Sequence, residues 1–233
     1  MRVIGIDAAP GGWAVVFQRD QALGIRKIPT LGALSDWGRD YQLIAIDIPI
    51  GLIDCYEIGG RICDRTARAL LRNRGSSVFP PPVRSVLKAS SYPEACAISR
   101  ASSPFNKAIS QQAYNIIPKI REVDKLLRSN FNLRSIVREV HPEVCFRELV
   151  GAPMAHSKRK RAGREERRTA LRGVFPDFDA LEVSDRAQNI PVEDILDAAM
   201  ACWSAQRLAR GQGRSLAETI PIDSAGLAMA IWV

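Results

Sequence analysis

The 233-residue sequence predicts an α/β protein, and three features of the chain support this class. Three short apolar or alternating segments, each typical of a strand, follow one another within the first 28 residues. A fourth segment, LIAIDI (43–48), has the continuous apolar character of a strand that is covered on both faces. Much of the remaining chain has the 3–4-residue apolar spacing of amphipathic helices.

The first elements are expected in a simple order. RVIGID (2–7), GWAVVFQ (12–18) and ALGIRKI (22–28) predict a three-stranded antiparallel meander, because only short turns separate them. A helical stretch around TLGALSDWGRD (30–40) precedes LIAIDI, which Pro49 and Gly51 terminate.

Residues 55–133 are predicted to form a mostly helical insertion after the fourth strand, within a single domain of residues 1–233. Helical spacing occupies 61–75 and 111–130, and GSSVFPPP (75–82) suits an ordered lip beside a cleft. Strand character returns at RSIVREVHP (134–142). A last helix is expected over 191–211, and GLAMAIWV (226–233) is expected to be a strand or a buried tail.

The net charge of +8 is unevenly distributed, since residues 158–172 contain eight basic and two acidic side chains. This excess favours an anionic partner such as nucleic acid or a nucleotide, and a solvated helix face is the alternative. Residues 65, 68 and 72 share one helical face, and residues 158–161 suit a mobile phosphate-binding arm or an exposed loop. The predicted nucleic-acid-binding residues are Arg61, Arg65, Arg68, Arg72, Lys158, Arg159, Lys160 and Arg161.

The sequence predicts a cytoplasmic protein with no membrane partner, and a homodimer is left open. Asp7 interrupts the apolar run that a signal peptide would need, and no segment approaches the roughly 18 apolar residues of a membrane span. Five scattered cysteines without a C-x-x-C pair, and only two histidines, do not predict a zinc site.

Four acidic side chains stand in apolar surroundings. Asp7 and Asp47 each follow an isoleucine at or near the end of a predicted strand, so neighbouring strands would bring them together. Glu139 lies on a strand expected beside the second of these, and Asp197 is the only charge in ILDAAMACWSAQ (195–206). Asp194, three residues earlier, shares a helical face with Asp197.

Four of these five acids also have a structural interpretation, and Asp197 has none. Asp7 and Asp47 could be turn residues, Asp194 a first-turn helix charge, and Glu139 the ion-pair partner of Arg138 or Arg147. If the acids converge, however, a like-charged pair about 4 Å apart costs roughly 4 kcal/mol at an effective dielectric of about 20, so a cation must lie among them.

An all-oxygen cluster selects a hard cation, so we expect Mg²⁺ or Mn²⁺, which could support phosphodiester cleavage. The predicted catalytic residues are Asp7, Asp47, Glu139 and Asp197, and the predicted metal ligands are these four and Asp194. His141, near Glu139, is interpreted as a structural residue, a substrate contact or a proton relay.

The order of GIDAAPGGW, AIDIPIGL, REVHPE and EDILDA resembles the ribonuclease-H-like superfamily. More narrowly, RICDRTAR, RGSSVFPPP, QAYNIIPKI, VREVHPE, HSKRKRAGREER and DSAGLAMAIWV are similar to domain-of-unknown-function family 429, a group of predicted nucleases. The resemblance implies a five-stranded mixed sheet of order 3-2-1-4-5 flanked by helices. It also implies metal-binding roles for Asp7, Asp47 and Asp197, with Glu139 or Asp194 completing the set. An obvious acid on the helix after the third strand is missing from the sequence.

The leading hypothesis is therefore a metal-dependent nuclease. A non-catalytic nucleic-acid-binding protein is one alternative, although 6% aromatic residues argue against extensive base stacking. An ATP-using phosphotransferase of actin-like fold ranks lower, because such proteins need two domains of this kind and the chain has room for one and an insertion.

Overall fold

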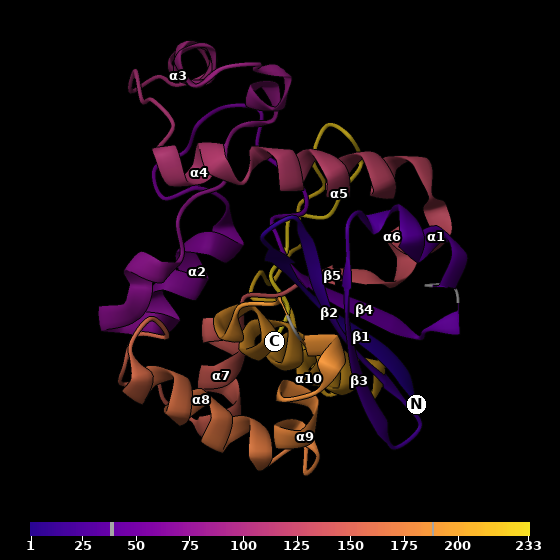
Figure 1. Ribbon diagram of the computed structural model, residues 1–233. Helices are drawn as coiled ribbons and strands as arrows, with labels where there is room; N and C mark the ends of the chain where they lie inside the picture. Colours follow the sequence, from indigo (N-terminus) through magenta and orange to yellow (C-terminus); the bar gives the residue numbers. More distant parts are fainter. Residues whose placement is uncertain (38–39, 188) are drawn as a thin grey trace.

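The computed structural model of the protein describes residues 1–37, 40–187 and 189–233 (Figure 1). Within these ranges a five-stranded mixed sheet forms the centre of the fold, in the order β3-β2-β1-β4-β5. Its strands are β1 (Arg2–Ala9), β2 (Gly12–Arg19), β3 (Ala22–Ile28), β4 (Leu43–Asp47) and β5 (Val137–Glu139). The first three pair antiparallel, and β4 and β5 add in parallel beside β1. The α/β class, the meander and the predicted strand order are confirmed.

Side chains of β1 alternate between two hydrophobic cores. Val3 belongs to the core that contains helix α10 (Val192–Ala209), whereas Ile4 and Ile6 belong to the core on the opposite face. This two-residue period is that of a strand buried on both sides. Gly5 and Asp7 are two and four residues after Val3, so they lie on the same face of the sheet, which α10 covers.

The opposite face of the sheet is covered by apolar side chains of the insertion and its neighbours. Ile120, Val123 and Leu127 of α5 (Ile117–Ser129) and Leu133 of α6 (Phe131–Ile136) pack there with Ile4 and Ile6. The sheet is thus a middle layer between helices (Figure 1).

The predicted insertion, residues 55–133, runs between β4 and β5 and is mostly helical. It contains α2 (Ile62–Leu71), the 3-10 helices η3 (Arg72–Ser77) and η4 (Arg84–Lys88), α3 (Tyr92–Ala101), α4 (Gln111–Asn115), α5 and the first half of α6. Outside it lie η1 (Leu31–Ala33), α1 (Leu34–Trp37), α7 (Pro142–Val150), α8 (Arg161–Arg172), α9 (Phe178–Glu182) and η5 (Asp185–Ala187). Figure 1 shows α2, α7 and α8 on one side of the sheet, with α3 and α4 beyond α2.

One expected element differs from the structure, and the C-terminal segment takes one of its two expected forms. The strand predicted over 134–142 is only three residues long, because α6 continues to Ile136. The C-terminal segment 226–233 is a tail with isolated bridges, in which Trp232 pairs with Val140 and with Ser215. Residues 38–39 of the helix predicted over 30–40 lie outside the described residues.

None of the helices in the described ranges combines the length and the hydropathy that a membrane crossing requires.

Candidate metal centre

Two of the predicted acids lie side by side at the ends of adjacent strands. Strands β1 and β4 are parallel, and their register pairs Asp7 with Asp47. Paired residues of neighbouring strands point to the same face of a sheet, so both carboxylates project on the side of α10. Asp7 is further fixed by the backbone N–H of Ala8, which donates to its Oδ1 at 2.7 Å.

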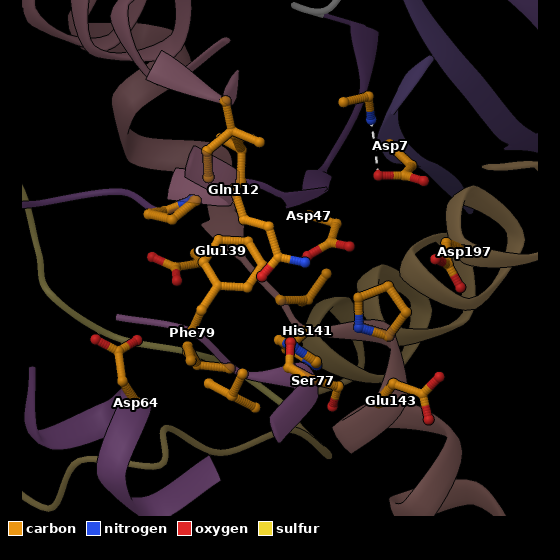
Figure 2. A pocket seen from close by; sticks show the side chains of 18 of the residues that line it. Asp7, Asp47, Asp64, Ser77, Phe79, Gln112, Glu139, His141, Glu143 and Asp197 are labelled. Atoms are coloured by element: carbon orange, nitrogen blue, oxygen red, sulfur yellow. Dashed lines mark hydrogen bonds between the residues drawn. The ribbon is translucent and has the colours of Figure 1, made fainter. Parts of the chain in front are cut away.

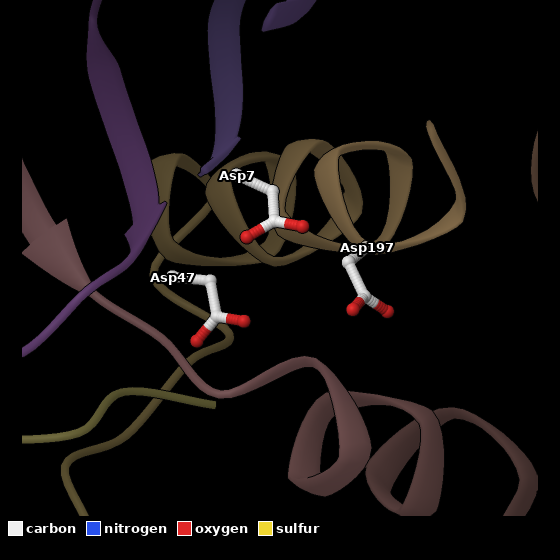
Figure 3. A group of neighbouring side chains, drawn as sticks. All are labelled: Asp7, Asp47 and Asp197. Atoms are coloured by element: carbon white, nitrogen blue, oxygen red, sulfur yellow. The ribbon is translucent and has the colours of Figure 1, made fainter. Parts of the chain in front are cut away.

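Gly5 lets helix α10 approach β1 closely enough to place a third acid beside the first two. A Cβ atom at Gly5 would lie 2.0 Å from the backbone nitrogen of Cys202 and 2.2 Å from the carbonyl oxygen of Ala198. Such contacts are impossible for any residue with a side chain. The close approach positions Asp197, which is one residue before Ala198 on α10, opposite the ends of the two strands (Figure 3).

Asp7, Asp47 and Asp197 form a compact group that we call the acidic trio. One carboxylate oxygen from each lies within 4.8 Å of the others (Figure 3). Asp7 is 7% and Asp197 only 2% exposed. Oδ1 of Asp197 is buried and accepts no hydrogen bond from the described residues. An unsatisfied buried oxygen beside two further carboxylates is a donor set that suits a hard cation.

The electrostatics of the trio show the cost of gathering these charges. Burial, followed by the charges of Asp47 and Asp197, raises the pKa of Asp7 well above its usual range. Burial and the charge of Asp197 raise the pKa of Asp47 to about 7. Both shifts disfavour the ionised forms, so the trio favours any positive charge that enters it.

Lys158 partly compensates this negative charge. It lies in the segment between α7 and α8, and its Nζ donates to Oδ2 of Asp197. Burial alone would lower the pKa of Lys158, but the carboxylates of Asp197, Asp7 and Asp47 outweigh it and raise the pKa. One ammonium opposite three carboxylates leaves the site with excess negative charge.

Glu139, predicted to be a ligand, is not part of the trio. The register pairs Glu139 with Ile46, so its side chain has the opposite parity to Asp47. Its two oxygens accept from the guanidinium of Arg61 at 2.5 and 2.7 Å, and its Oε2 also accepts from the backbone N–H of Ile50 at 2.6 Å. The alternative interpretation of Glu139, a structural ion pair, fits these contacts, although its partner is Arg61 and not Arg138 or Arg147.

Asp194 also lies outside the trio. It is partly buried one turn before Asp197, and burial raises its pKa to about 6. Among the described residues no carboxylate takes the place of the acid missing after the third strand, because Asp36 and Asp40 are both exposed and outside the group.

The predicted phosphate-binding arginines of α2 are mostly occupied by the protein itself. Arg61 is 2% exposed and is bound by Glu139 and Asp64. Arg65 pairs with Glu57 at 3.0 Å and donates to the carbonyl of Gly60. Arg68 donates to the carbonyls of residues 59 and 78. The prediction of Arg61 as a nucleic-acid contact is therefore corrected, since its guanidinium is needed inside the fold.

Other predicted basic residues remain at the surface. Arg72 is exposed at the end of α2, and Arg159, Lys160 and Arg161 are exposed around the start of α8. Of these four, Arg159 lines the pocket that contains the acidic trio.

The trio opens into a pocket of about 490 Å³ (Figure 2). Its walls include the predicted lip, from Ser76 to Phe79, and Gln112 and Ile116 from the region of α4. No pattern in the sequence selects Gln112 or Phe79 as functional residues. Their place in the wall depends on how the insertion folds back over the sheet, and no local signal reports that.

Two further titratable groups line this pocket. Burial lowers the pKa of His141, and its Nδ1 has no hydrogen-bond partner in the described ranges. Glu143, in the first turn of α7, is 6% exposed; its Oε1 accepts from Arg167 at 2.5 Å. Its Oε2 is buried without a described partner. Sequence reasoning missed Glu143, although its place directly after His141 and Pro142 was a usable signal.

The fold and the site together define an α/β protein with a five-stranded mixed sheet and a buried acidic trio at the ends of β1, β4 and the start of α10. The family described as "Protein of unknown function (DUF429)" matches residues 5–222, so the chain belongs to this family. No curated protein and no solved structure matches the chain.

Proposed function

We propose that this protein is a metal-dependent nuclease of ribonuclease-H-like fold. The single observation that carries the proposal is the convergence of Asp7, Asp47 and Asp197 from three separate elements into one largely buried, all-carboxylate group. The strand order and the positions of these acids on the first strand, the fourth strand and a C-terminal helix support it. A domain that needed these residues only for stability would gain more from apolar side chains in the same places.

The three carboxylates would hold Mg²⁺ or Mn²⁺, since the donors are all oxygen and thiolates do not take part in the group. When bound, such a cation supplies Lewis-acid chemistry, which polarises a phosphate and favours deprotonation of an attacking water. Oδ1 of Asp197 accepts no hydrogen bond from the described residues, so this oxygen is free to coordinate the cation.

The remaining residues of the pocket would bind and orient the substrate. Lys158 and Arg159 line it beside the trio, and their positive charge would attract a phosphate group. His141, whose lowered pKa keeps the imidazole neutral at pH 7, can accept a proton through its free Nδ1. These roles divide the site into a phosphate-binding side and a proton acceptor.

The proposal is tested by incubating the purified protein with single-stranded, double-stranded and hybrid nucleic acids in Mn²⁺, Mg²⁺ or EDTA. We expect cleavage that requires the metal and falls at least about 100-fold in Asp47→Asn. Asp36→Asn, which removes an exposed acid from α1, is the matched control and should retain full activity. Cleavage that is unchanged by Asp47→Asn would assign the activity to a contaminant and remove the proposal.

A further inference from the structure

The pocket that contains the acidic trio has two chemically different sides. Figure 2 shows Asp7 and Asp197 on one side and Gln112 and Phe79 on the other, with Asp47 between them. Lys158 pairs with Asp197, so the first side is charged. On the other side the partly buried side chains of Phe79 and Ile116 provide apolar surface, next to Glu139 and Asp64, whose carboxylates are both paired with Arg61. With a cation held by the trio, which rests on the proposed function, a ligand that fills the pocket would join an anionic group to an apolar, planar or compact one.

The helical insertion closes the pocket on the side away from the sheet. The lip before Phe79 and the region of α4 both belong to residues 55–133, and both line the same space as Asp7 and Asp47. A volume of about 490 Å³ lies in the range of small-molecule sites, roughly 300–1,000 Å³. Nucleic-acid duplexes are bound on extended surfaces that bury about 1,000 Å² or more of protein. The insertion thus converts the end of the sheet into a pocket of small-molecule size.

The distribution of basic side chains also favours a small ligand over a duplex. A protein that follows a duplex needs a row of free basic side chains for successive phosphates. On α2, however, Arg61 is buried in an ion pair, and Arg65 and Arg68 donate to backbone carbonyls. Four basic residues line the pocket, and two of them, Arg61 and Arg74, face Glu139 and Glu143 of the protein itself. Lys158 and Arg159 remain beside the trio, and they suffice for one phosphate.

Gln112 supplies a recognition group on the apolar side. Its amide carries a donor and an acceptor and makes no hydrogen bond to the described residues, whereas the amide of the preceding Gln111 is bound to Asn115 at 3.0 Å. Figure 2 shows the Gln112 side chain extending into the pocket beside Phe79. An aromatic ring next to a free amide is the combination that stacks on an unpaired base and reads its edge.

We propose that the pocket takes a single nucleotide, with its phosphate beside the acidic trio and Lys158 and its base against Phe79 and Gln112. The substrate is then a phosphodiester at the free end of a single strand or in a dinucleotide. The bond that is cut rests on the proposed function, but the binding of one nucleotide does not depend on turnover.

Binding is tested by calorimetric titration of the protein with adenosine 5′-monophosphate, ribose 5-phosphate or inorganic phosphate, in buffer with Mg²⁺. Because base stacking contributes about 1–3 kcal/mol, the nucleotide should bind at least about fivefold more tightly than ribose 5-phosphate. Phe79→Ala and Gln112→Ala should reduce this preference and leave the affinity for ribose 5-phosphate unchanged. That unchanged affinity also shows that the variants are folded.

Two matched controls lie in the same insertion or its border but outside the pocket. Phe131 is 78% exposed, and Gln111 is bound to Asn115, so Phe131→Ala and Gln111→Ala should keep the wild-type preference. Equal binding of the nucleotide and ribose 5-phosphate, or a preference that survives Phe79→Ala and Gln112→Ala together, would overturn the proposal.

The nucleotide could belong to a dinucleotide or to the free end of a single strand. Cleavage assays in Mn²⁺ with a dinucleotide, a linear single strand, a circular single strand and a duplex distinguish these two substrates. Consumption of the dinucleotide alone identifies a small substrate, and shortening of the linear strand with the circle spared identifies a strand end. A circle or duplex cut as fast as the linear strand would refute a single-nucleotide site. If nothing is cut while the base-dependent binding persists, the nuclease proposal fails and the nucleotide pocket stands.

Discussion

Replacing Asp47 by asparagine should stabilise the metal-free protein at alkaline pH. Burial and the charge of Asp197 raise the pKa of Asp47 from 3.8 to about 7, so at pH 8 the folded state holds an ionised group that it disfavours. A shift of about three pKa units corresponds to roughly 4 kcal/mol. Asp47 is only partly buried, and solvent screening reduces this figure to about 2–4 kcal/mol. Asparagine has nearly the same shape and removes the charge.

The sign of the pH dependence follows from the direction of the shift. Since the pKa of Asp47 is higher in the folded than in the unfolded protein, the folded state binds a proton more tightly. The contribution of Asp47 to the stability of the wild-type protein is therefore fully present below about pH 4 and is lost as the pH rises through about 7. The advantage of Asp47→Asn should accordingly be largest at pH 8 and fall to about 1 kcal/mol or less at pH 4.5.

The measurement is urea unfolding of the wild type and Asp47→Asn in EDTA at both pH values, with Asp36→Asn as the control that should change nothing. Addition of Mg²⁺ or Mn²⁺ at pH 8 should then stabilise the wild type and leave Asp47→Asn almost unaffected. If Asp47→Asn were less stable than the wild type at pH 8 in EDTA, the carboxylates would not be repelling one another, and the main argument for a cation would be lost.

Three further predictions concern the surroundings of the trio. Gly5→Ala should lower the free energy of unfolding by at least about 2 kcal/mol, because a Cβ atom cannot fit against α10. It should also abolish the Mn²⁺-induced rise in Tm. The control Gly32→Ala should change neither quantity. Glu139→Gln should cost about 1–3 kcal/mol in urea unfolding, because buried Arg61 loses one of its two carboxylate partners and keeps Asp64. The double variant Glu139→Gln/Arg61→Met should lose less than the sum of the single changes. Lys158→Gln should tighten Mn²⁺ binding about tenfold or more at low ionic strength, as measured by electron paramagnetic resonance, because a competing positive charge leaves the site.

Each of these has a result that would contradict it. A folded Gly5→Ala protein with normal Mn²⁺ stabilisation would show that α10 can move away without disturbing the trio. If Glu139→Gln lost the Mn²⁺-induced rise in Tm, Glu139 would have to be a metal ligand after all. Unchanged or weaker Mn²⁺ binding in Lys158→Gln, relative to the exposed control Lys160→Gln, would show that Lys158 does not oppose the cation.

The sequence by itself determined the local part of this protein. Alternation and short turns predicted the meander, and the apolar segment around Asp47 predicted the buried strand that pairs with β1. Asp197 was identified because a lone charge on an otherwise apolar helix stands out without any knowledge of its neighbours. These signals depend on residues close together in the chain, and therefore survive without the tertiary structure.

Only the tertiary structure decided the register and the partners. Glu139 pairs with Ile46 and not with Asp47, and a shift of one residue reverses the face of a strand side chain. The sequence pattern predicted that Arg61 is a surface cation, but in the structure it contacts Glu139, which lies 78 residues away in the chain. The pocket wall formed by Gln112 likewise depends on how the insertion packs on the sheet. Such choices are made by contacts between distant segments, whose energies no local pattern of residues contains.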